Sequence, residues 1–244
     1  MGKLIAIWGP PGAGKTTFAV KLGLALQENT GMHVYTVLCD TTTPALPVLF
    51  PRIKTDDMYS IGFALSKVHA TQNEIEACTV SMKSHPDLAF LGYKDGENHF
   101  SYPATDVAKN AELLMTLTDM ADAVIVDCTA VPDNMSKAAM ANADIIFRVV
   151  SPDLKSVSFC SSQLPLLVDP VYQCDNHITI INEIANDVYS PVYEASQYFS
   201  NVEITLPYCH DIRMQSFNGD LLNSTRSKKY NKQMIEILNK IVAE

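Results

Sequence analysis

The sequence predicts an α/β protein, with a doubly wound, mostly parallel sheet flanked by helices. Short apolar runs rich in β-branched residues alternate along the chain with longer amphipathic stretches. The runs are apolar on both faces, which is typical of parallel strands that helices cover on each side. A glycine-rich segment separates the first run from the first amphipathic stretch. With 244 residues, of which 47% are hydrophobic, we expect residues 1–244 to form a single domain.

The expected strands begin close to the N-terminus and recur along most of the chain. In order they are LIAIW (4–8), HVYTVLC (33–39), LAFLGY (88–93), AVIVD (123–127), DIIFRVV (144–150), HITIIN (177–182) and VEITLP (202–207). In a sheet of this kind, ligands bind at the carboxyl ends of the strands. Residues 60–93 indicate two helices before the third of these strands, and Asn73–Glu76 are polar enough for a loop or a helix start.

Two helices can be predicted in more detail. Thr105 and Asp106 can cap a helix whose inner side carries Leu113, Leu114, Leu117 and Met120. The basic stretch 226–232 is interpreted as the solvated start of the last helix. That helix has apolar residues at helical spacing, and we expect them to pack in the core: Met234, Ile235, Leu238, Ile241 and Val242. A helix lying on a membrane surface is the alternative for this stripe.

Composition narrows the classes of function. A net charge of −9 argues against broad adhesion to nucleic acid. The six cysteines form no Cys-x-x-Cys pair, which argues against zinc and disulfide frameworks and for a reducing compartment. No signal peptide is evident, and no apolar run approaches the roughly 20 residues of a membrane span. We expect a cytoplasmic protein, with peripheral association at the inner face of the membrane left open.

Residues 9–16, GPPGAGKT, match the pattern G-x-x-x-x-G-K-[ST] of a phosphate-binding loop. The match follows an expected strand and opens an expected helix, which is the context that such a loop requires. Glycines let the backbone turn its N–H groups toward an anion, and the helix start adds a positive dipole end. We therefore expect ATP or ADP with Mg²⁺ to bind here, through Gly9, Pro11, Gly12, Ala13, Gly14, Lys15, Thr16 and Thr17.

Within this site, Lys15 is expected to bridge the β- and γ-phosphates, and the Thr16 hydroxyl to bind magnesium. Asp127 ends an apolar run, where a carboxylate is costly unless it is paired or close to a cation, so we expect it to hold magnesium. Asp40 ends the strand that follows the first helix. We expect it to position the attacking water or a magnesium-bound water, and capping a turn is its alternative role.

Two other classes of phosphate-loop protein fit less well. AAA-type ATPases have an Asp-Glu pair at the second motif, whereas Cys128 follows Asp127 here. Small-molecule kinases clamp the transferred phosphate with an arginine-rich lid. The arginines of this chain form no cluster in the sequence; they are Arg52, Arg148, Arg213 and Arg226.

From its first strand to its last helix, the chain resembles the ParA/MinD-type P-loop ATPases of the SIMIBI class, including the CpaE-like and MinD-like proteins. Asp40 falls at the family's switch I aspartate, and residues 124–157 are similar to its switch II segment and the strand that follows. The resemblance implies that Asn182 faces the adenine. Residues 203–222 are similar to the family's C-terminal close, in which Pro207 and Tyr208 would border the base and Arg213 would start a helix.

Pro10 departs from this resemblance. ParA and MinD proteins have a signature lysine at that position, which reaches across a nucleotide-sandwiched dimer to the partner's phosphates. Proline supplies no charge, and a missing charge beside the developing phosphate negativity costs roughly a few kcal/mol in the transition state. We therefore expect ATP binding to survive. For hydrolysis three alternatives stay open: the protein hydrolyses ATP without that lysine, another residue replaces it, or turnover is slow.

The resemblance implies a Mg-dependent ATPase switch that forms a nucleotide-dependent homodimer and binds a protein partner. Its outputs would be positioning, partition or assembly: plasmid or chromosome partition, septum placement, or a pilus or conjugation apparatus. The acidic charge does not support association with DNA or membrane. Alternatives are a nucleotide-binding scaffold with little hydrolysis, and a small-molecule phosphotransferase or ATP-dependent ligase on the same fold. Cys39 and Cys128 flank the two aspartates, either as buried packing or as metal-holding thiols at a dimer interface.

Overall fold

The structure is a computed structural model that describes residues 1–183 and 192–243. The described strands form one sheet with the order β3-β4-β2-β5-β1-β6-β7-β8. All neighbouring pairs are parallel except β3–β4, which is antiparallel. The strands are β1 (Lys3–Trp8), β2 (Val34–Leu38), β3 (Val80–Met82), β4 (His85–Gly92), β5 (Ala123–Asp127), β6 (Ile145–Val150), β7 (Ile178–Asn182) and β8 (Val202–Leu206).

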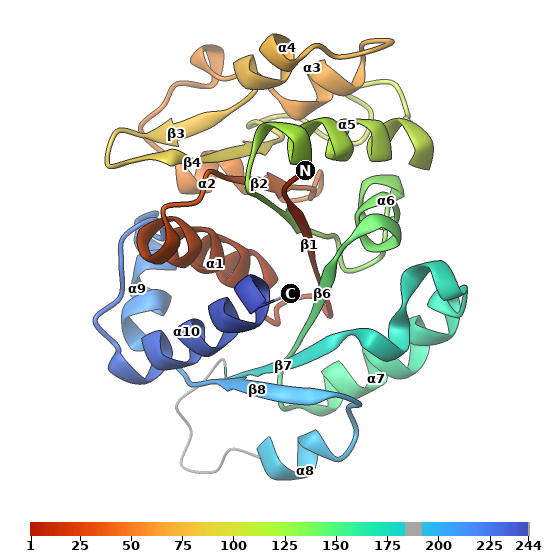
Figure 1. The fold of residues 1–244 in the computed structure, drawn as a ribbon, viewed down its shortest axis with the longest axis vertical. Helices are drawn as coiled ribbons and strands as arrows, with labels where there is room; N and C mark the ends of the chain where they lie inside the picture. Colours follow the sequence, from red (N-terminus) through yellow and green to blue (C-terminus); the bar gives the residue numbers. More distant parts are fainter. Residues whose placement is uncertain (184–191, 244) are drawn as a thin grey trace.

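Helices cover both faces of this sheet, as predicted. In Figure 1, α1, α9 and α10 lie on one side of the sheet, and α5, α6 and α7 lie on the other. The described helices are α1 (Lys15–Thr30), α2 (Leu46–Leu49), α3 (Ile61–Leu65), α4 (Gln72–Ala77), α5 (Val107–Met120), α6 (Asn134–Asn142), α7 (Leu154–Gln163), α8 (Val192–Ser196), α9 (His210–Asn218) and α10 (Lys228–Ala243). None of them is both long and apolar enough to cross a bilayer.

Alternate side chains of the central strand supply the two halves of the core. Ile5 and Ile7 are fully buried on the side of α1 and α10, and Leu4 and Trp8 are buried on the side of α5 and α6. A strand that is apolar at every position needs helices on both faces, because either face left in water would expose a row of large apolar side chains. The continuous apolar run LIAIW therefore explains why β1 lies at the centre of the sheet.

The register of the central strands determines where the functional segments meet. Asp127, the last residue of β5, pairs with Ile7 of β1 on one side and with Leu38 of β2 on the other. Because these strands are parallel, their carboxyl ends finish at the same edge of the sheet. The segments that follow β1, β2 and β5 therefore lie together at that edge.

All seven predicted strands are present within three residues of their predicted bounds. The prediction missed β3, a three-residue antiparallel edge strand, because a run so short gives no periodic pattern. In the same region the two expected helices are α3 and α4. Asn73–Glu76 lie inside α4, whose start is fixed by a capping box between Thr71 and Glu74.

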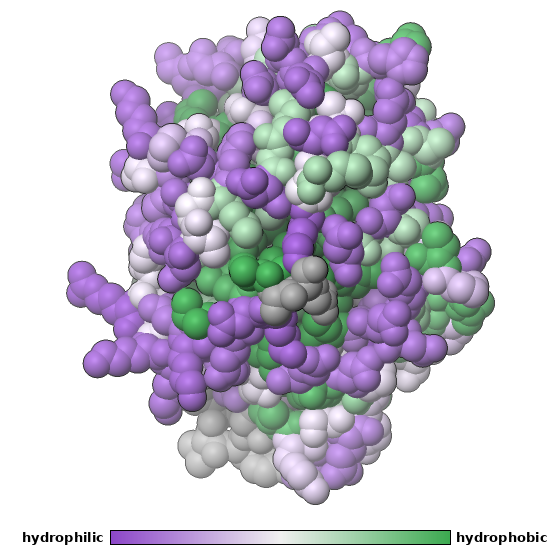
Figure 2. Space-filling model, in the orientation of Figure 1, coloured by the Kyte–Doolittle hydropathy of each residue, from purple (hydrophilic) through white to green (hydrophobic). Residues whose placement is uncertain are grey.

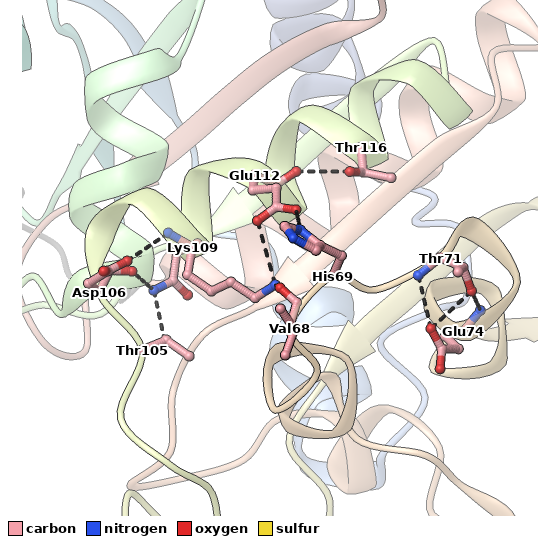
Figure 3. Close-up of polar contacts among 10 residues, drawn as sticks. Val68, His69, Thr71, Glu74, Thr105, Asp106, Lys109, Glu112 and Thr116 are labelled. Atoms are coloured by element: carbon pink, nitrogen blue, oxygen red, sulfur yellow. Dashed lines mark hydrogen bonds and ion pairs between the residues drawn. The ribbon is translucent and has the colours of Figure 1, made fainter.

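The predicted cap of α5 is confirmed. The Asp106 carboxylate accepts a hydrogen bond from the backbone N–H of Lys109 at 2.8 Å, and Leu113, Leu114 and Leu117 are buried. Met120, also expected on the inner side, is only half-buried. Figure 3 shows that α5 also contacts the loop between α3 and α4. Lys109 Nζ donates to the Val68 carbonyl, and the Glu112 carboxylate, one turn further along α5, forms a hydrogen bond with the His69 ring. The loop between α3 and α4 is thus held against α5.

The prediction for the last helix is partly wrong. Met234, Leu238 and Ile241 are buried, as expected, but Ile235 and Val242 are 41% and 54% exposed. The buried stripe also contains Tyr230 and Ile237, so its centre lies about one residue from the predicted one. Most of the molecular face that carries α10 is hydrophilic, with hydrophobic residues gathered near its centre and at its right-hand edge (Figure 2).

Candidate functional site

The loop after β1 has a backbone that favours glycine, most clearly at Gly9 and Gly14. Gly9 and Gly14 have φ angles of 149° and 88°. A Cβ on Gly9 would lie 2.0 Å from the Val149 carbonyl oxygen, and one on Gly14 would lie 2.4 Å from Asn182 Nδ2. The loop then passes directly into α1 at Lys15. Its N–H groups and the helix dipole are thus available to an anion, as the sequence motif predicts.

Lys15 folds back over this loop. Its Nζ donates to the Pro10 carbonyl at 3.1 Å, and the backbone N–H of Ala13 donates to the same oxygen at 3.4 Å. Burial lowers the pKa of Lys15, and the carboxylate of Asp127 acts in the opposite direction. The ammonium group is therefore partly desolvated and held by a neutral acceptor, for which a phosphate oxygen would be a stronger, charge-assisted replacement.

Asp127 and Thr16 meet at the end of β5. The Thr16 hydroxyl donates to Asp127 Oδ2 at 2.6 Å, and Asp127 is only 4% exposed. Its other oxygen, Oδ1, is buried without a hydrogen-bond partner among the described residues. Burial raises the pKa of Asp127 to about 6, although the Thr16 hydrogen bond and the Lys15 charge lower it. A buried carboxylate with one orphaned oxygen is a costly arrangement that a bound cation would relieve.

These residues fit a magnesium ion. Mg²⁺ prefers hard oxygen ligands and is commonly held by one or two protein groups together with phosphate oxygens and water. The Thr16 hydroxyl and the Asp127 carboxylate supply such oxygens beside a phosphate-binding loop. The sequence had assigned a third oxygen, from Asp40, to the same ion or to its water.

Asp40 is bonded differently. Its Oδ1 accepts from the backbone N–H groups of Thr42 and Thr43 at 2.7 and 3.1 Å, and its Oδ2 accepts from the Thr43 hydroxyl at 2.8 Å. Burial raises the pKa of Asp40, but these hydrogen bonds more than offset it, so that the pKa lies below its usual value. In this state Asp40 caps a turn, which is the alternative that the sequence left open. It still lies near enough to influence the pKa of Asp127 and Lys15.

A cavity of about 260 Å³ opens beside the loop, between α1, α9 and the ends of β7 and β8. The residues that the family resemblance assigns to the base, Asn182, Pro207 and Tyr208, all line it. Asn182 Nδ2 donates to the Ala13 carbonyl at 2.8 Å, which joins the cavity wall to the loop. The other lining residues are Gly12, Gly14, Thr17, Phe18, Glu183, Cys209, Ile212, Arg213, Ser216, Phe217 and Tyr230.

Sequence reasoning missed the apolar wall of this cavity. Phe18 comes from α1, Ile212 from α9 and Tyr230 from α10, so helices from the two ends of the chain contribute to it. The spacing of Cys209, Ile212 and Ser216 was the available signal, since residues at i, i+3 and i+7 share one face of a helix. Arg213 was expected to start this helix, which instead begins at His210.

Lys21 is a second missed residue. It lies in α1 with 5% of its surface exposed, and its Nζ donates to Gln215 Oε1, the Leu221 carbonyl and the Asn223 carbonyl at 2.6, 2.7 and 2.6 Å. Burial lowers the pKa of Lys21 to about 8. This lysine fastens α1 to the connection between α9 and α10, and thereby holds the wall of the cavity against the loop.

The segment that follows β5 is tied to the strand that carries the loop. Trp8, the last residue of β1, donates from its indole Nε1 to the Ala130 carbonyl at 3.1 Å. Cys39 and Cys128 are free thiols buried on the same side of the sheet as Trp8. Burial raises the pKa of both thiols well above the usual value, so each is held neutral.

No protein-family model matches the sequence, and no curated protein matches it. Solved structures do resemble it. A chain of the MinC:MinD cell division protein complex of Aquifex aeolicus superposes with a TM-score of 0.76 at 18% identity, over 98% of this chain and 96% of that chain. The septum site-determining protein MinD of Pyrococcus horikoshii OT3, complexed with Mg-ADP, gives 0.75 at 20% identity, over 99% and 98% of the two chains.

A putative plasmid partition protein from Borrelia burgdorferi B31, bound to AMPPNP, gives a TM-score of 0.72 at 18% identity, over 100% of this chain and 99% of that chain. These similarities extend along the whole chain on both sides. The chain therefore has the fold of the MinD and ParA proteins, and the fold that the sequence resemblance implies is confirmed.

Proposed function

We propose that this protein is a nucleotide-operated switch that binds ATP with magnesium and hydrolyses it slowly. The observation that carries the proposal is the pair formed by Thr16 and the buried Asp127 beneath a phosphate-binding loop, with one carboxylate oxygen lacking a partner. In this proposal Lys15 exchanges the Pro10 carbonyl for phosphate oxygens, and residues 1–244 act as one nucleotide-binding domain. Solved structures of the same fold contain Mg-ADP and AMPPNP, which supports this choice of ligand.

Magnesium would be held by the Thr16 hydroxyl and by Asp127, directly or through water. When bound, the ion would neutralise charge on the phosphate oxygens and orient them for attack by water. The chain's own contribution is to keep the site dry and fixed: β5 buries Asp127, α1 presents Thr16 and Lys15, and the glycine turns bring the backbone close to the phosphates.

Asp40 would orient the attacking water or a magnesium-bound water. In the present structure its oxygens accept hydrogen bonds from Thr42 and Thr43, so this role requires the turn to rearrange when nucleotide binds. The base would enter the cavity lined by Asn182, Pro207 and Tyr208. Nucleotide would thus order the segments after β2 and β5, and hydrolysis would release them.

Such a switch would act through a partner. The neighbours of known structure include a cell division ATPase, a MinC:MinD complex and a putative plasmid partition protein. By analogy, we propose a role in positioning, partition or assembly of a cellular structure, through a nucleotide-dependent homodimer and a protein partner. The protein would work in the cytoplasm, free or at the inner face of the membrane. This assignment rests on fold-level analogy.

Pro10 favours a second candidate, a nucleotide-binding scaffold that hydrolyses little. Pro10 is buried and uncharged, and its structural contribution is the carbonyl that receives Lys15. Without a charge at this position the site lacks one source of transition-state stabilisation, while the elements that bind phosphate are intact. The two candidates differ only in turnover.

Phosphate release under saturating ATP and Mg²⁺ separates them. If the protein is a slow ATPase, the wild type exceeds the Lys15→Ala variant, and Asp40→Ala loses turnover but still binds ATP. A Pro10→Lys variant that gains turnover would support the explanation given for the slow rate. If wild-type release stays at the level of Lys15→Ala, even with protein partners added, the ATPase proposal fails and the scaffold is favoured.

A further inference from the structure

A second cavity, of about 690 Å³, lies away from the nucleotide site. It opens between Arg148 of β6, Ser200, which precedes β8, and residues 164–176, which follow α7 and contain three short 3-10 turns. It shares no lining residue with the cavity beside the phosphate loop. Its volume is within the usual range of small-molecule sites.

Arg148 of β6 lies at the inner wall of this cavity. It is only 2% exposed, which makes it one of the most deeply buried charged side chains among the described residues. Its Nε and Nη2 donate to Thr179 Oγ1 at 3.1 and 2.8 Å, and Nη2 also donates to the carbonyl and hydroxyl oxygens of Ser200 at 3.0 and 2.9 Å. All these acceptors are neutral.

No carboxylate within the described part of the chain forms an ion pair with Arg148. Burial lowers its pKa, but a guanidinium group stays protonated in a protein. A buried charge without a counterion is a costly feature, since an apolar side chain of similar volume would fill the same space without the desolvation penalty. A purely structural role could be met more cheaply by Met or Leu.

The third nitrogen of the guanidinium group is the one left over. No hydrogen bond of the described residues uses Nη1. Nη1 is also absent from the side-chain atoms that are sealed from solvent without a partner. Arg148 lines the cavity, and Nη1 is its one guanidinium nitrogen without a hydrogen-bond partner among the described residues. The wall of the cavity thus contains a fixed positive charge with one nitrogen whose donors are not used by the described residues.

The walls of the cavity indicate the rest of the ligand. Leu164, Pro165, Leu167 and Pro170 form an apolar side, and Val168, which is 77% exposed, lies at its edge. In Figure 2 hydrophobic residues gather at the right-hand edge of the molecule, where Figure 1 draws the segment that follows α7. A ligand with an apolar body would bury this surface, which the described residues leave partly in water.

The charge around the cavity limits the ligand's own charge. Asp169 and Asp175 also line it, and the whole chain has a net charge of −9. These carboxylates would repel a dianion such as phosphate more strongly than a monoanion. A cavity with one available guanidinium nitrogen and apolar walls therefore suits a ligand that has a single carboxylate on an apolar body.

We propose that this cavity is a binding site for a small organic monocarboxylic acid, whose carboxylate accepts hydrogen bonds from Arg148 Nη1 and whose apolar body packs on residues 164–170. The site is separate from the nucleotide site and does not depend on the function proposed for it. Thr179 and Ser200 position the guanidinium group, and residues 164–170 select for the apolar body.

The test uses ¹⁹F NMR with 4-fluorobenzoate titrated into the full-length wild-type protein, in the presence of excess ADP and Mg²⁺ so that the nucleotide site is filled. We expect saturable binding. 4-Fluorobenzamide, which has nearly the same shape without the charge, should bind at least tenfold more weakly, because a neutral carbonyl replaces the carboxylate that accepts from the guanidinium group. Hexanoate should displace 4-fluorobenzoate, and inorganic phosphate at equal ionic strength should not.

Two variants locate the site. Arg148→Met fills the same space without charge and should weaken 4-fluorobenzoate binding at least tenfold. Val168→Trp changes an exposed residue at the cavity edge and should also weaken it, by occlusion. Because Val168 is exposed, this variant keeps the test valid if Arg148→Met fails to fold.

The proposal is overturned if neither 4-fluorobenzoate nor hexanoate binds the wild type, or if the amide binds as well as the acid. It is also overturned if binding is unchanged in both variants, which would place the acid elsewhere. Displacement of 4-fluorobenzoate by phosphate would also contradict the proposal, because it would indicate a site for inorganic anions in which the apolar wall has no role.

Discussion

The ends of β5 and β2 are neighbours in the sheet, and an aspartate lies at or just after the end of each strand, yet the two carboxylates are bonded in opposite ways. Asp127 is buried, has one oxygen without a partner, and has a raised pKa. Asp40 is half-buried, accepts three hydrogen bonds from its own turn, and has a lowered pKa. The first carboxylate is incomplete without a cation, whereas the second is complete as it stands.

This difference distinguishes binding from switching. A group that is already buried and incompletely bonded can serve a ligand without rearrangement, so Asp127 is preorganised for magnesium. A group satisfied by its own turn must give up those bonds before it can serve a ligand, so Asp40 can act only in a changed conformation. We therefore propose that Asp127, at the end of β5, contributes to the affinity for magnesium, and that Asp40, after β2, takes part in the conformational change on nucleotide binding.

Removing each carboxylate should separate these roles most strongly. Asp127→Ala is expected to weaken Mg–ADP binding by about a hundredfold or more, since it deletes the charged group that faces the cation. Asp40→Ala is expected to change the same affinity less than threefold. Isothermal titration with and without Mg²⁺ measures both. Equal losses in the two variants would remove the distinction between the strand ends.

The pH dependence of binding should follow Asp127. With a pKa of about 6, this carboxyl becomes protonated as pH falls through that value, and the protonated form does not bind a cation. Mg–ADP affinity should therefore fall roughly tenfold between pH 7 and pH 5. Protonation of ADP itself contributes to this fall, so Asp127→Asn serves as the control. The excess of the wild-type dependence over that of the variant is the predicted effect, and identical profiles would contradict it.

Substitutions of Asp127 and Asp40 should change the free energy of unfolding in opposite directions. The pKa of Asp127 is raised on folding, so its contribution to stability falls as pH rises from about 4 to 6. Neutral Asp127→Asn should then be more stable than the wild type by about 1–3 kcal/mol at pH 7.5 without ligand. Asp40→Ala should be less stable by about 0.5 kcal/mol, a loss of turn capping that solvent screening keeps small.

Urea unfolding at pH 7.5 gives both values. Repeating it at pH 4.5 sharpens the comparison, because the stabilisation by Asp127→Asn should shrink as the wild-type carboxyl becomes protonated. A destabilised Asp127→Asn at pH 7.5 would mean that its partnership with Thr16 and Lys15 outweighs the cost of its burial.

The smallest expected effect is optical. Trp8 is the only tryptophan of the chain, and its indole donates to the carbonyl of Ala130, three residues after Asp127. If nucleotide and magnesium shift the segment after β5, the Trp8 fluorescence should change on their addition and should not change in Lys15→Ala. A binding signal in calorimetry with no change in fluorescence would indicate that this segment keeps its position.

Local patterns predicted the parts of the site that depend on strand and loop. The spacing of GPPGAGKT and the apolar run before Asp127 were sufficient to place Thr16 and Asp127 together, because parallel strands end at one edge. The turn that Asp40 caps was left open, since an aspartate after a strand suits both a cap and a ligand. Roles in binding the nucleotide stay predictions for all these residues.

Tertiary contacts explain what the sequence could not predict. Phe18, Ile212 and Tyr230 face one cavity although they lie on three helices, and nothing local indicates that they share it. Arg148 looked like an isolated residue in a strand, and only the structure brings it beside Thr179 and Ser200. The predicted buried stripe of α10 differed from the observed one because apolar Ile235 and Val242 lie at its border, where packing rather than composition decides exposure.

A thermal-shift titration with ATP and Mg²⁺ tests the central claim most directly, with the wild type compared with Lys15→Ala. A ligand at a hundred times its dissociation constant stabilises the protein that binds it by about 2.7 kcal/mol. The account predicts a clear, magnesium-dependent rise in melting temperature for the wild type and none for Lys15→Ala at the same concentrations. An unshifted wild type, or an equal shift in the two proteins, would contradict it.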